Sequence, residues 1–413
     1  MRKNLLELEK ILQLLQKVNN AFEQTRSMEA TLVNEILNDI EMVNLEVYGC
    51  KEYPGISLHK YTDNPRFFSE QFKKWQNLLS EELQCRKSII NKIDYDFHVL
   101  SAHISTTSKE SLLEEAVDCL KQFRQNSEMN YKHTKQVYNN YHYFWGSLDL
   151  DNGNIDLLKN RIHEIKSHWD DFCWLYNNLT DYRSKKVLYG ILRYWMTFDC
   201  VTKNSIVENN YDDYYDFDII TCNKEEVFVD LGAYNGDSTL SFIDNFGVYK
   251  RIYCYEMTDS SMEIMKQRLA DFDRIVYRQV AVGNMAGVVC INPVNSLSSY
   301  TVMPQESNIE ESSHTIQIPM VKLDDDIQEP ITFLKMDIEG SELEAMKGAE
   351  QHIRNDKPKL AVCSYHNNHH IYEIPQLMKK YNPQYKLYMR YNGPLDHPLT
   401  SEYVTFALDS RDD

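Results

Sequence analysis

The sequence predicts an α/β protein, with a doubly wound parallel sheet in its C-terminal half and a mainly α-helical N-terminal domain before it. Two observations support this. Residues 1 to about 200 are poor in glycine and proline and carry apolar side chains at helical spacing. From Glu226 on, short apolar runs of strand length alternate with helical segments, as in a parallel sheet covered by helices.

The elements expected in the C-terminal half follow from these runs. Strands are expected at 227–231, 251–256, 275–282, 287–291, 315–321, 331–336, 359–365, 385–391 and 402–408. Helices are expected between them, with the clearest ones at 237–246, 260–272 and from 342 to about 349.

The N-terminal half predicts helices at about 66–92, 109–126, 129–145, 155–178 and 181–199. Before these, Leu5, Leu8, Leu12 and Leu15 form an a/d-like stripe, and a second stripe runs through 33–47. The two stripes predict either a hairpin within the chain or a coiled coil that makes a homodimer. We expect a helical domain at 1–150, with a possible coiled-coil hairpin at 1–48, a helical lead-in at 151–220 and the sheet domain at 221–413.

The composition narrows the classes of partner. The net charge is −18, and the densest basic cluster, Arg183 to Lys186, is short, so we expect no nucleic-acid partner. No apolar run approaches the roughly 18 residues of a membrane span. Nine cysteines without a C-x-x-C pair predict reduced thiols rather than disulfides or a zinc ribbon. Because Glu7 and Glu9 interrupt the only signal-like start, we expect a cytoplasmic protein.

A strand, a glycine turn and a helix carry the first site motif. The run 229–238 ends a strand in an acid and turns over two glycines before a helix; its candidate ligand-binding residues are Asp230, Gly232, Ala233, Tyr234, Gly236 and Ser238. Glu256 ends the next strand, where an acid can accept hydrogen bonds from both ribose hydroxyls of an adenosine. The pattern predicts an adenosine-containing cofactor.

Charge distinguishes between the two main cofactor classes. Tyr234 stands where a dinucleotide fingerprint has its middle glycine, and Asp230 would repel a diphosphate beside it. S-adenosylmethionine has no phosphate and brings a sulfonium and an ammonium, which suit an acid. We therefore predict S-adenosylmethionine as the cofactor, with a dinucleotide oxidoreductase as the alternative.

A second acidic motif occupies 334–342, again at the end of a strand and before a helix. Ligands bind outside the carboxyl ends of parallel strands, so Asp230, Glu256 and Asp337 are expected at one edge of the sheet. Lys335 is expected to pair with Glu339 or with the acid at 342.

These motifs together resemble the FkbM family of methyltransferases. The resemblance rests on V-D-L-G-A-Y-N-G-D-S at 229–238, Y-E at 255–256, A-V-G at 281–283 and L-K-M-D-I-E-G-S-E at 334–342, and it covers about 221–408. It implies a class I, Rossmann-like core that binds S-adenosylmethionine, and methyl transfer to oxygen, in many members on glycans or polyketide-type products. Most of 1–150 lies outside it.

The resemblance also implies roles for single residues. Gly232 and Gly236 look like the cofactor loop, Asp230 like its carboxylate and Glu256 like the ribose acceptor. Ala281 and Val282 lie where the adenine ring is usually flanked, and Asp337 where the methyl group would be presented.

Methyl transfer is an in-line displacement, so positioning is expected to outweigh base catalysis. Our hypothesis from the sequence is that Asp337 or His366 takes the acceptor proton and that Glu339 places the substrate. His366 and His369 are expected in a solvated loop, and no metal site is expected. The predicted acceptor is a sugar hydroxyl of a cell-surface glycan, by family analogy. A further alternative is a non-catalytic helical interaction protein whose cofactor domain is a relic.

Overall fold

The computed structural model describes residues 91–208, 211, 214–291, 301–302, 316–392 and 401–409. The possible coiled-coil hairpin at 1–48 and nearly all of the predicted helix at 66–92 lie outside these residues. The chain forms two compact units, Met1–Ser108 and Lys109–Asp413. In the first, α4 (Lys92–Thr106) is capped by the side chain of Asn91, which accepts a hydrogen bond from the Asp94 N–H at 3.1 Å.

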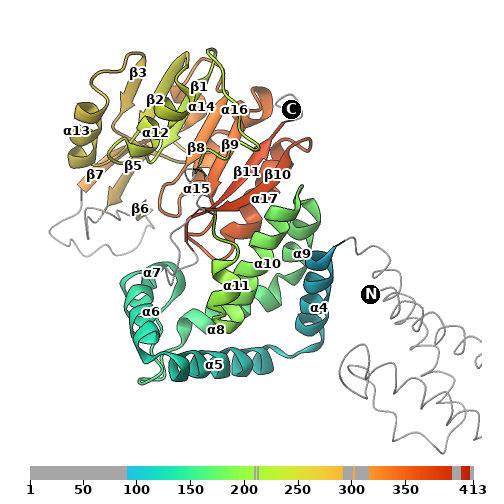
Figure 1. Cartoon of the computed structure of the whole chain (residues 1–413). Helices are drawn as coiled ribbons and strands as arrows, with labels where there is room; N and C mark the ends of the chain where they lie inside the picture. The colour runs from blue at the N-terminus through green and yellow to red at the C-terminus, as the bar shows by residue number, and fades with distance from the viewer. Residues whose placement is uncertain are drawn as a thin grey trace, which may run out of the picture. The chain divides into compact units, whose positions relative to one another are not determined.

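The second unit begins with a layer of helices (Figure 1). They are α5 (Lys109–Asn126), α6 (Glu128–Asn140), α7 (His142–Trp145), α8 (Asp156–Ser167), α9 (Trp169–Asn178), α10 (Tyr182–Thr197) and α11 (Cys200–Asn204). The predicted helices at 129–145 and 155–178 are each divided in two, at Tyr141 and His168. Helix α10 packs against α5, α8 and the strand β10 (Lys386–Tyr391), so it joins the helices to the sheet.

A seven-stranded sheet follows, in the order β10-β11-β9-β8-β1-β2-β3. Its other strands are β1 (Val227–Leu231), β2 (Arg251–Tyr255), β3 (Ile275–Arg278), β8 (Phe333–Met336), β9 (Lys359–Cys363) and β11 (Tyr403–Leu408). The strand order reverses between β1 and β8, which are parallel neighbours. A crevice for ligands is expected at the carboxyl ends of the strands at such a reversal.

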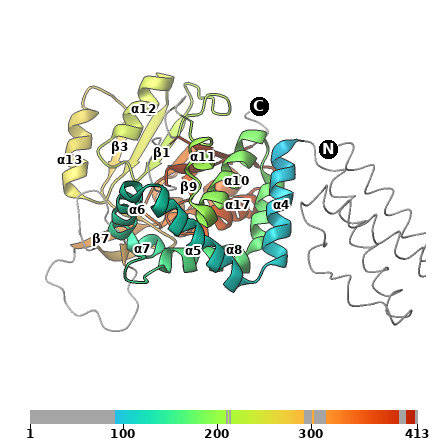
Figure 2. The ribbon, with the colours of Figure 1, turned by 60° about the horizontal axis from the view of Figure 1, so that its bottom comes forward.

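Helices accompany the strands of this sheet (Figures 1 and 2). They are α12 (Asp237–Phe246), α13 (Asp259–Arg268), α14 (Leu323–Asp326), α15 (Glu342–Gly348), α16 (Glu350–Asn355) and α17 (His370–Tyr381). Under α12, the ring of Phe242 stacks on Phe228 of β1 at 4.3 Å, and Phe333 of β8 lies beside Phe228. This aromatic core fixes α12 over the two central strands.

Two features of the sheets were not anticipated. Strand β11 runs antiparallel to both neighbours, because the short connection from β10 leaves no room for the helical crossover that a parallel strand needs. The predicted strand 275–282 is divided between two sheets. Its end, β4 (Ala281–Val282), joins β5 (Gly287–Ile291), β6 (Thr301–Val302) and β7 (Ile316–Val321) in a four-stranded sheet. The predicted α/β class, with a largely parallel sheet behind a helical region, is confirmed.

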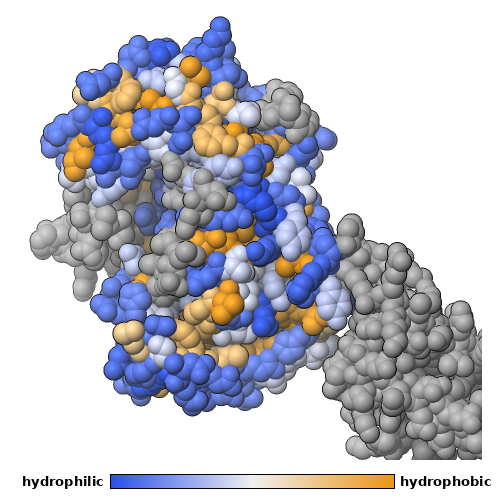
Figure 3. Space-filling view, viewed as in Figure 1, coloured by the Kyte–Doolittle hydropathy of each residue, from blue (hydrophilic) through white to orange (hydrophobic). Residues whose placement is uncertain are grey.

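No helix in the described ranges is long and apolar enough to cross a membrane. The face of the molecule shown in Figure 3 is largely hydrophilic, with apolar side chains scattered among the charged ones.

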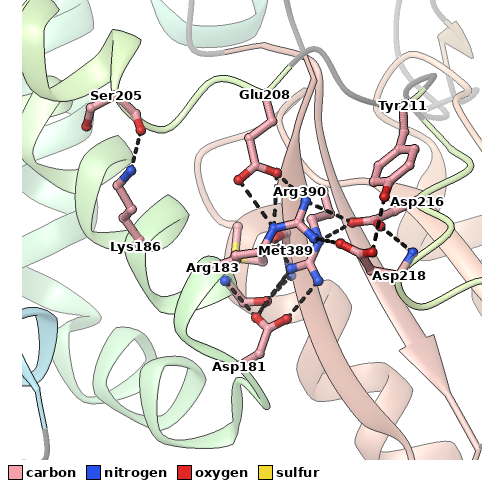
Figure 4. Close-up of polar contacts among 11 residues, drawn as sticks. Asp181, Arg183, Lys186, Ser205, Glu208, Tyr211, Asp216, Asp218, Met389 and Arg390 are labelled. Carbon is pink, nitrogen blue, oxygen red and sulfur yellow. Dashed lines mark hydrogen bonds and ion pairs between the residues drawn. The ribbon is translucent and has the colours of Figure 1, made fainter.

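Residues 205–208, 211 and 214–218, which we call the strap, come between α11 and β1 in the chain and are held by ion pairs to Arg390 and Arg183 (Figure 4). Arg390 of β10, which is 1% exposed, donates to Asp216 of the strap and, at 2.7 Å, to Asp181 at the start of α10. Arg183 of α10 lies 2.6 Å from Asp218 and also contacts Glu208. These contacts lock the strap to both α10 and the sheet.

Replacing Arg390 with methionine is expected to lower the free energy of unfolding by about 3–5 kcal/mol, because the fully buried Asp216 loses its hydrogen-bonded cation and keeps only Arg183 at 3.2 Å, and the ion pair with Asp181 is lost as well. The control is Arg183→Met, whose side chain is 27% exposed and is expected to cost about 1 kcal/mol. Urea unfolding followed by circular dichroism measures both. Equal losses for the two variants would contradict the assignment of Arg390 as the centre of the network.

Candidate active site

A cavity of about 730 Å³ opens at the carboxyl ends of β1, β2 and β8, within the size range of small-molecule sites. Of the residues predicted from the sequence, those that line it are Gly232, Tyr234, Ser238, Glu256, Ala281, Val282, Asp337 and Glu339. Asp230, Ala233, Gly236 and His366 do not line it. The strap adds Tyr211 and Tyr214 to its wall, and the chain around the β10–β11 connection adds Asn392 and Glu402.

The turn after β1 requires its two glycines. Gly232 has a φ of +75°, and a Cβ there would lie 1.8 Å from the carbonyl oxygen of Asp337. Gly236, with a φ of +82°, caps α12, and a Cβ on it would lie 2.9 Å from Met265. Any side chain at Gly232 would therefore separate the two motifs that the fold brings together.

Asp230 supports this turn from behind. It is fully buried, and its Oδ2 accepts hydrogen bonds from the hydroxyls of Ser238 at 2.6 Å and Thr239 at 2.7 Å. Its Oδ1 lies 2.9 Å from the ammonium of Lys335, which also donates to the carbonyl of Gly232 at 2.8 Å. The expected pairing of Lys335 with Glu339 or Glu342 is wrong, because the lysine points across the sheet to β1 rather than along its own motif.

Lys335 stays protonated in this buried pair. Burial opposes the positive charge, but Asp230 and Asp337 outweigh it and hold the pKa of Lys335 above its ordinary value. The negative charge of Asp230 is therefore compensated by Lys335, and Asp230 does not line the cavity. The argument that Asp230 repels a diphosphate is therefore weaker than the sequence indicated.

Glu256 lies at the end of β2 and lines the cavity. Its Oε1 accepts hydrogen bonds from the N–H of Thr258 at 2.7 Å and from the hydroxyl of Thr258 at 2.8 Å. Burial raises the pKa of Glu256, while these donors and the N–H groups of Met257 and Tyr234 counteract it. The second carboxylate oxygen is not used by Thr258, so the acid can accept from a ligand.

The 334–342 motif brings two acids to the opposite side of the cavity. The Oδ2 of Asp337 accepts a hydrogen bond from the hydroxyl of Tyr214 at 2.7 Å, and its Oδ1 accepts from Tyr365 at 3.5 Å. Burial raises the pKa of Glu339 to about 7; His366 lowers it and Asp337 raises it further. Glu339 therefore titrates close to neutral pH, as a general base should.

Behind these acids lies His366, which is 1% exposed, so the expected solvated loop is wrong. Its Nδ1 lies 2.9 Å from Glu342, and its Nε2 lies 3.6 Å from Asp337 and 3.5 Å from Glu339. Burial lowers the pKa of His366, but Glu342 and then Asp337 and Glu339 raise it to about 9. At neutral pH the ring is an imidazolium that has no free nitrogen with which to accept a proton.

Glu342 is the residue behind this charge, whereas the sequence suggested for it only a pairing with Lys335. It is fully buried, and its Oε1 accepts the N–H groups of Ile338 at 3.1 Å and Gly340 at 3.3 Å. Burial favours its neutral form, but His366 and His370 outweigh burial and hold its pKa well below the ordinary value. The sequence signal that could have identified Glu342 is its position, five residues after the strand-end acid Asp337 and at the start of α15.

A metal ion could find donors in Asp337, Glu342 and His366, whose ligand atoms lie within 4.8 Å of one another. The chemistry of this set favours an ion pair instead, since an imidazolium cannot ligate and Glu342 is engaged by backbone N–H groups. The expectation that no metal is used stays a prediction.

The helices and the strap also reach this cluster. The ring of Phe144 in α7 lies 5.4 Å from His366, and Trp145 donates from Nε1 to the carbonyl of Tyr365 at 2.8 Å. Tyr214 of the strap places its ring over the ammonium of Lys335 at 4.9 Å. These residues lie more than one hundred positions before the acids that they support, so no local pattern could have identified them.

Comparison with known proteins agrees with this geometry. Residues 230–385 match the model of the methyltransferase FkbM domain. The methyltransferase FkbM from Methylobacillus flagellatus KT is 23% identical with a TM-score of 0.51, over 62% of this chain and 63% of that one. An rRNA methylase from Streptococcus thermophilus is 14% identical with a TM-score of 0.28, over 45% and 87% of the two chains. No curated protein matches.

Residues 230–385 match the methyltransferase FkbM domain, so the resemblance predicted from the sequence is confirmed for these residues. The chain spans 63% of the length of the Methylobacillus structure.

Gly232→Ala is expected to destabilise the fold by more than about 4 kcal/mol or to prevent folding, because its Cβ would overlap the backbone of Asp337. The matched control is Gly247→Ala at the end of α12, where φ is +68° and nothing lies within 4 Å, so only the strain of about 1–2 kcal/mol applies. Thermal unfolding of both variants measures this. A Gly232→Ala protein as stable as the control would show that the turn can shift to accommodate the added methyl group.

The charge on His366 predicts a pH-dependent stability. Its pKa is about 9 when folded and near 6.5 when unfolded, so its contribution of ~3 kcal/mol is complete below pH 6.5 and lost as the pH rises through 9. Urea unfolding of a protein with His366 and of its His366→Gln variant at pH 6 and pH 9.5 is the measurement. The difference between the two proteins should shrink at high pH, and a constant difference would argue against an imidazolium. Both proteins also carry Glu339→Gln, because His366 lowers the pKa of Glu339 and its loss would otherwise alter that titration as well.

Proposed function

We propose that the chain is an S-adenosylmethionine-dependent O-methyltransferase that methylates a sugar hydroxyl of a glycan. The observation that carries this proposal is the arrangement of Glu256 and the Asp337–Glu339 pair in one cavity, at the edge of the sheet where the strand order reverses. This cavity offers an acid for a ribose at one side and a base beside a charged acid cluster at the other.

The residues present fit the cofactor. Glu256 is suited to ribose hydroxyls, and Met257, Ala281 and Val282 provide an apolar wall for an adenine ring. The carboxylates of the cavity suit a sulfonium and repel the diphosphate of a dinucleotide, which counts against the oxidoreductase alternative. S-adenosylmethionine supplies an electrophilic methyl group and a good leaving group.

Glu339 is the residue best placed to take the acceptor proton. Its pKa of about 7 makes it a stronger base than an ordinary carboxylate while it is still largely ionised above neutral pH. Asp337 is engaged by Tyr214 and Tyr365, so we assign it to holding the acceptor and the methyl group in line. This reverses the roles expected from the sequence, and His366 becomes the cation that orients both acids.

The proton balance is simple. The acceptor hydroxyl gives its proton to the Glu339 carboxylate as the oxygen–methyl bond forms, and the pair of electrons of the breaking carbon–sulfur bond returns to sulfur. General-base catalysis of this kind is worth about 10²–10⁴ in rate, while alignment contributes more.

Two further parts of the proposal concern location and assembly. The described cysteines are free thiols, which supports a cytoplasmic location. The a/d-like stripes at 1–48 support a homodimer.

Calorimetry and turnover separate the parts of this proposal. S-adenosylmethionine should bind the wild type; Glu256→Gln should bind it at least tenfold more weakly, whereas Glu339→Gln should bind it within about threefold. With a panel of methyl glycosides as acceptors, release of S-adenosylhomocysteine should fall about 10²–10⁴-fold in Glu339→Gln.

The pH dependence of activity tests the role of Glu339 more directly than the loss of turnover does. Wild-type activity should rise through pH 7 as Glu339 loses its proton and fall above about pH 9 as His366 loses its own. Glu339→Gln should lack the acidic limb. Near-normal turnover of this variant would remove Glu339 as the base, and absence of cofactor binding by the wild type would favour the non-catalytic interaction protein.

A further inference from the structure

The charges on the cavity wall are strongly one-sided. Among the described residues that line it are five carboxylates, namely Asp237, Glu256, Asp337, Glu339 and Glu402, and a single lysine, Lys335. That lysine is committed to Asp230 at 2.9 Å and is only 2% exposed. The other nearby cation, His366, is enclosed by Glu342, Asp337 and Glu339.

The stretches that connect the described parts of this unit add no lysine or arginine. Residues 209–213, 292–315 and 393–400 contain neither, and their basic side chains are two histidines. Arginine and lysine are the side chains that most often bind phosphate. Within the described lining, then, an anionic acceptor would meet carboxylates and no available counter-charge.

The magnitude of this effect decides the acceptor class. Two charges of the same sign repel strongly at close range in a partly buried site, because the effective dielectric constant there is lower than in water. A phosphate on the reacting sugar would lie among Asp337, Glu339 and Glu402, so more than one such pair would form. Even one pair, partly screened, corresponds to more than tenfold in affinity.

The same wall suits an uncharged sugar. The rings of Tyr211 and Tyr214 and the amide of Asn392 lie on the cavity wall with Glu402. Aromatic rings contact the apolar face of a sugar ring, and carboxylates and amides bind its hydroxyls. An amine on the sugar would gain from the carboxylates as well.

We infer that the acceptor is a neutral or amine-bearing sugar without phosphate. A sugar supplied in nucleotide-linked form carries a diphosphate, so it would have to lose that diphosphate, as in glycosyl transfer, before methylation. This inference rests on the proposed function and adds the chemical class and the order of reactions to it. It also places polyanions such as RNA outside the acceptor class.

Matched probes test the inference. For glucose, galactose, mannose and glucosamine, the methyl glycoside, the 1-phosphate and the uridine-diphosphate form are each compared in two assays. The first is release of S-adenosylhomocysteine by the full chain; the second is binding to the chain saturated with S-adenosylhomocysteine, by ligand-observed NMR. The glycoside of at least one sugar should exceed both phosphorylated partners at least tenfold.

A charge-reversing variant of the cavity wall tests whether charge determines the choice of acceptor. Glu402→Lys should raise the affinity for the 1-phosphate relative to the methyl glycoside at least tenfold. Glu225→Lys makes the same charge change at an exposed position before the amino end of β1, away from the cavity, and should leave the ratio unchanged.

The outcomes are distinct. Phosphorylated sugars that are methylated or bound as well as the glycosides would overturn the inference while the proposed function stands. A charge-reversed Glu402 variant with an unchanged ratio would likewise overturn it. Wild-type protein that binds no S-adenosylmethionine would overturn the proposed function, and cofactor binding without binding of any sugar would overturn the sugar acceptor and this inference together.

Discussion

The ion pair between Lys335 and Asp230 is the contact on which the site depends. It joins the ends of the two central strands where their order reverses, at 2.9 Å and out of contact with solvent. Asp230 also holds Ser238 and Thr239, so the pair sets the start of α12, and Lys335 holds the carbonyl of Gly232. A buried pair of this kind is weak evidence for stability. Here it aligns the glycine turn with the acidic motif.

The acid cluster also contains a buried cation: His366 lies beside the carboxylates of Asp337 and Glu339. His366 is kept charged by Glu342, which is itself held by two backbone N–H groups and by His370. The imidazolium allows Asp337 and Glu339 to lie close together without both becoming neutral. Burial then raises the pKa of Glu339 to about 7, which an isolated surface glutamate would not reach. Proton affinity at the site is therefore set by residues that do not face the ligand.

Sequence reasoning identified the fold and the location of the site because both depend on local patterns. The strand-turn-helix at 229–238 and the strand-end acids Glu256 and Asp337 obey spacing rules that hold for any parallel sheet. What it missed depends on tertiary structure. The partner of Lys335 lies 105 residues away, and the burial of His366 arises from packing against Phe144 of α7. The division of 275–282 between two sheets follows from pairing with β7, which comes some forty residues later.

The structure also changes the argument against phosphate in the proposed site. The charge argument first rested on Asp230, which is neutralised by Lys335 and hidden from the cavity. The same conclusion now rests on the carboxylates that do line the cavity, and it extends from the cofactor to the acceptor. The helical part of the chain takes part in this, because α10 anchors the strap that carries Tyr211 and Tyr214 to the cavity wall. If the proposed function holds, residues of the helices and the strap contribute to the choice of acceptor together with the sheet.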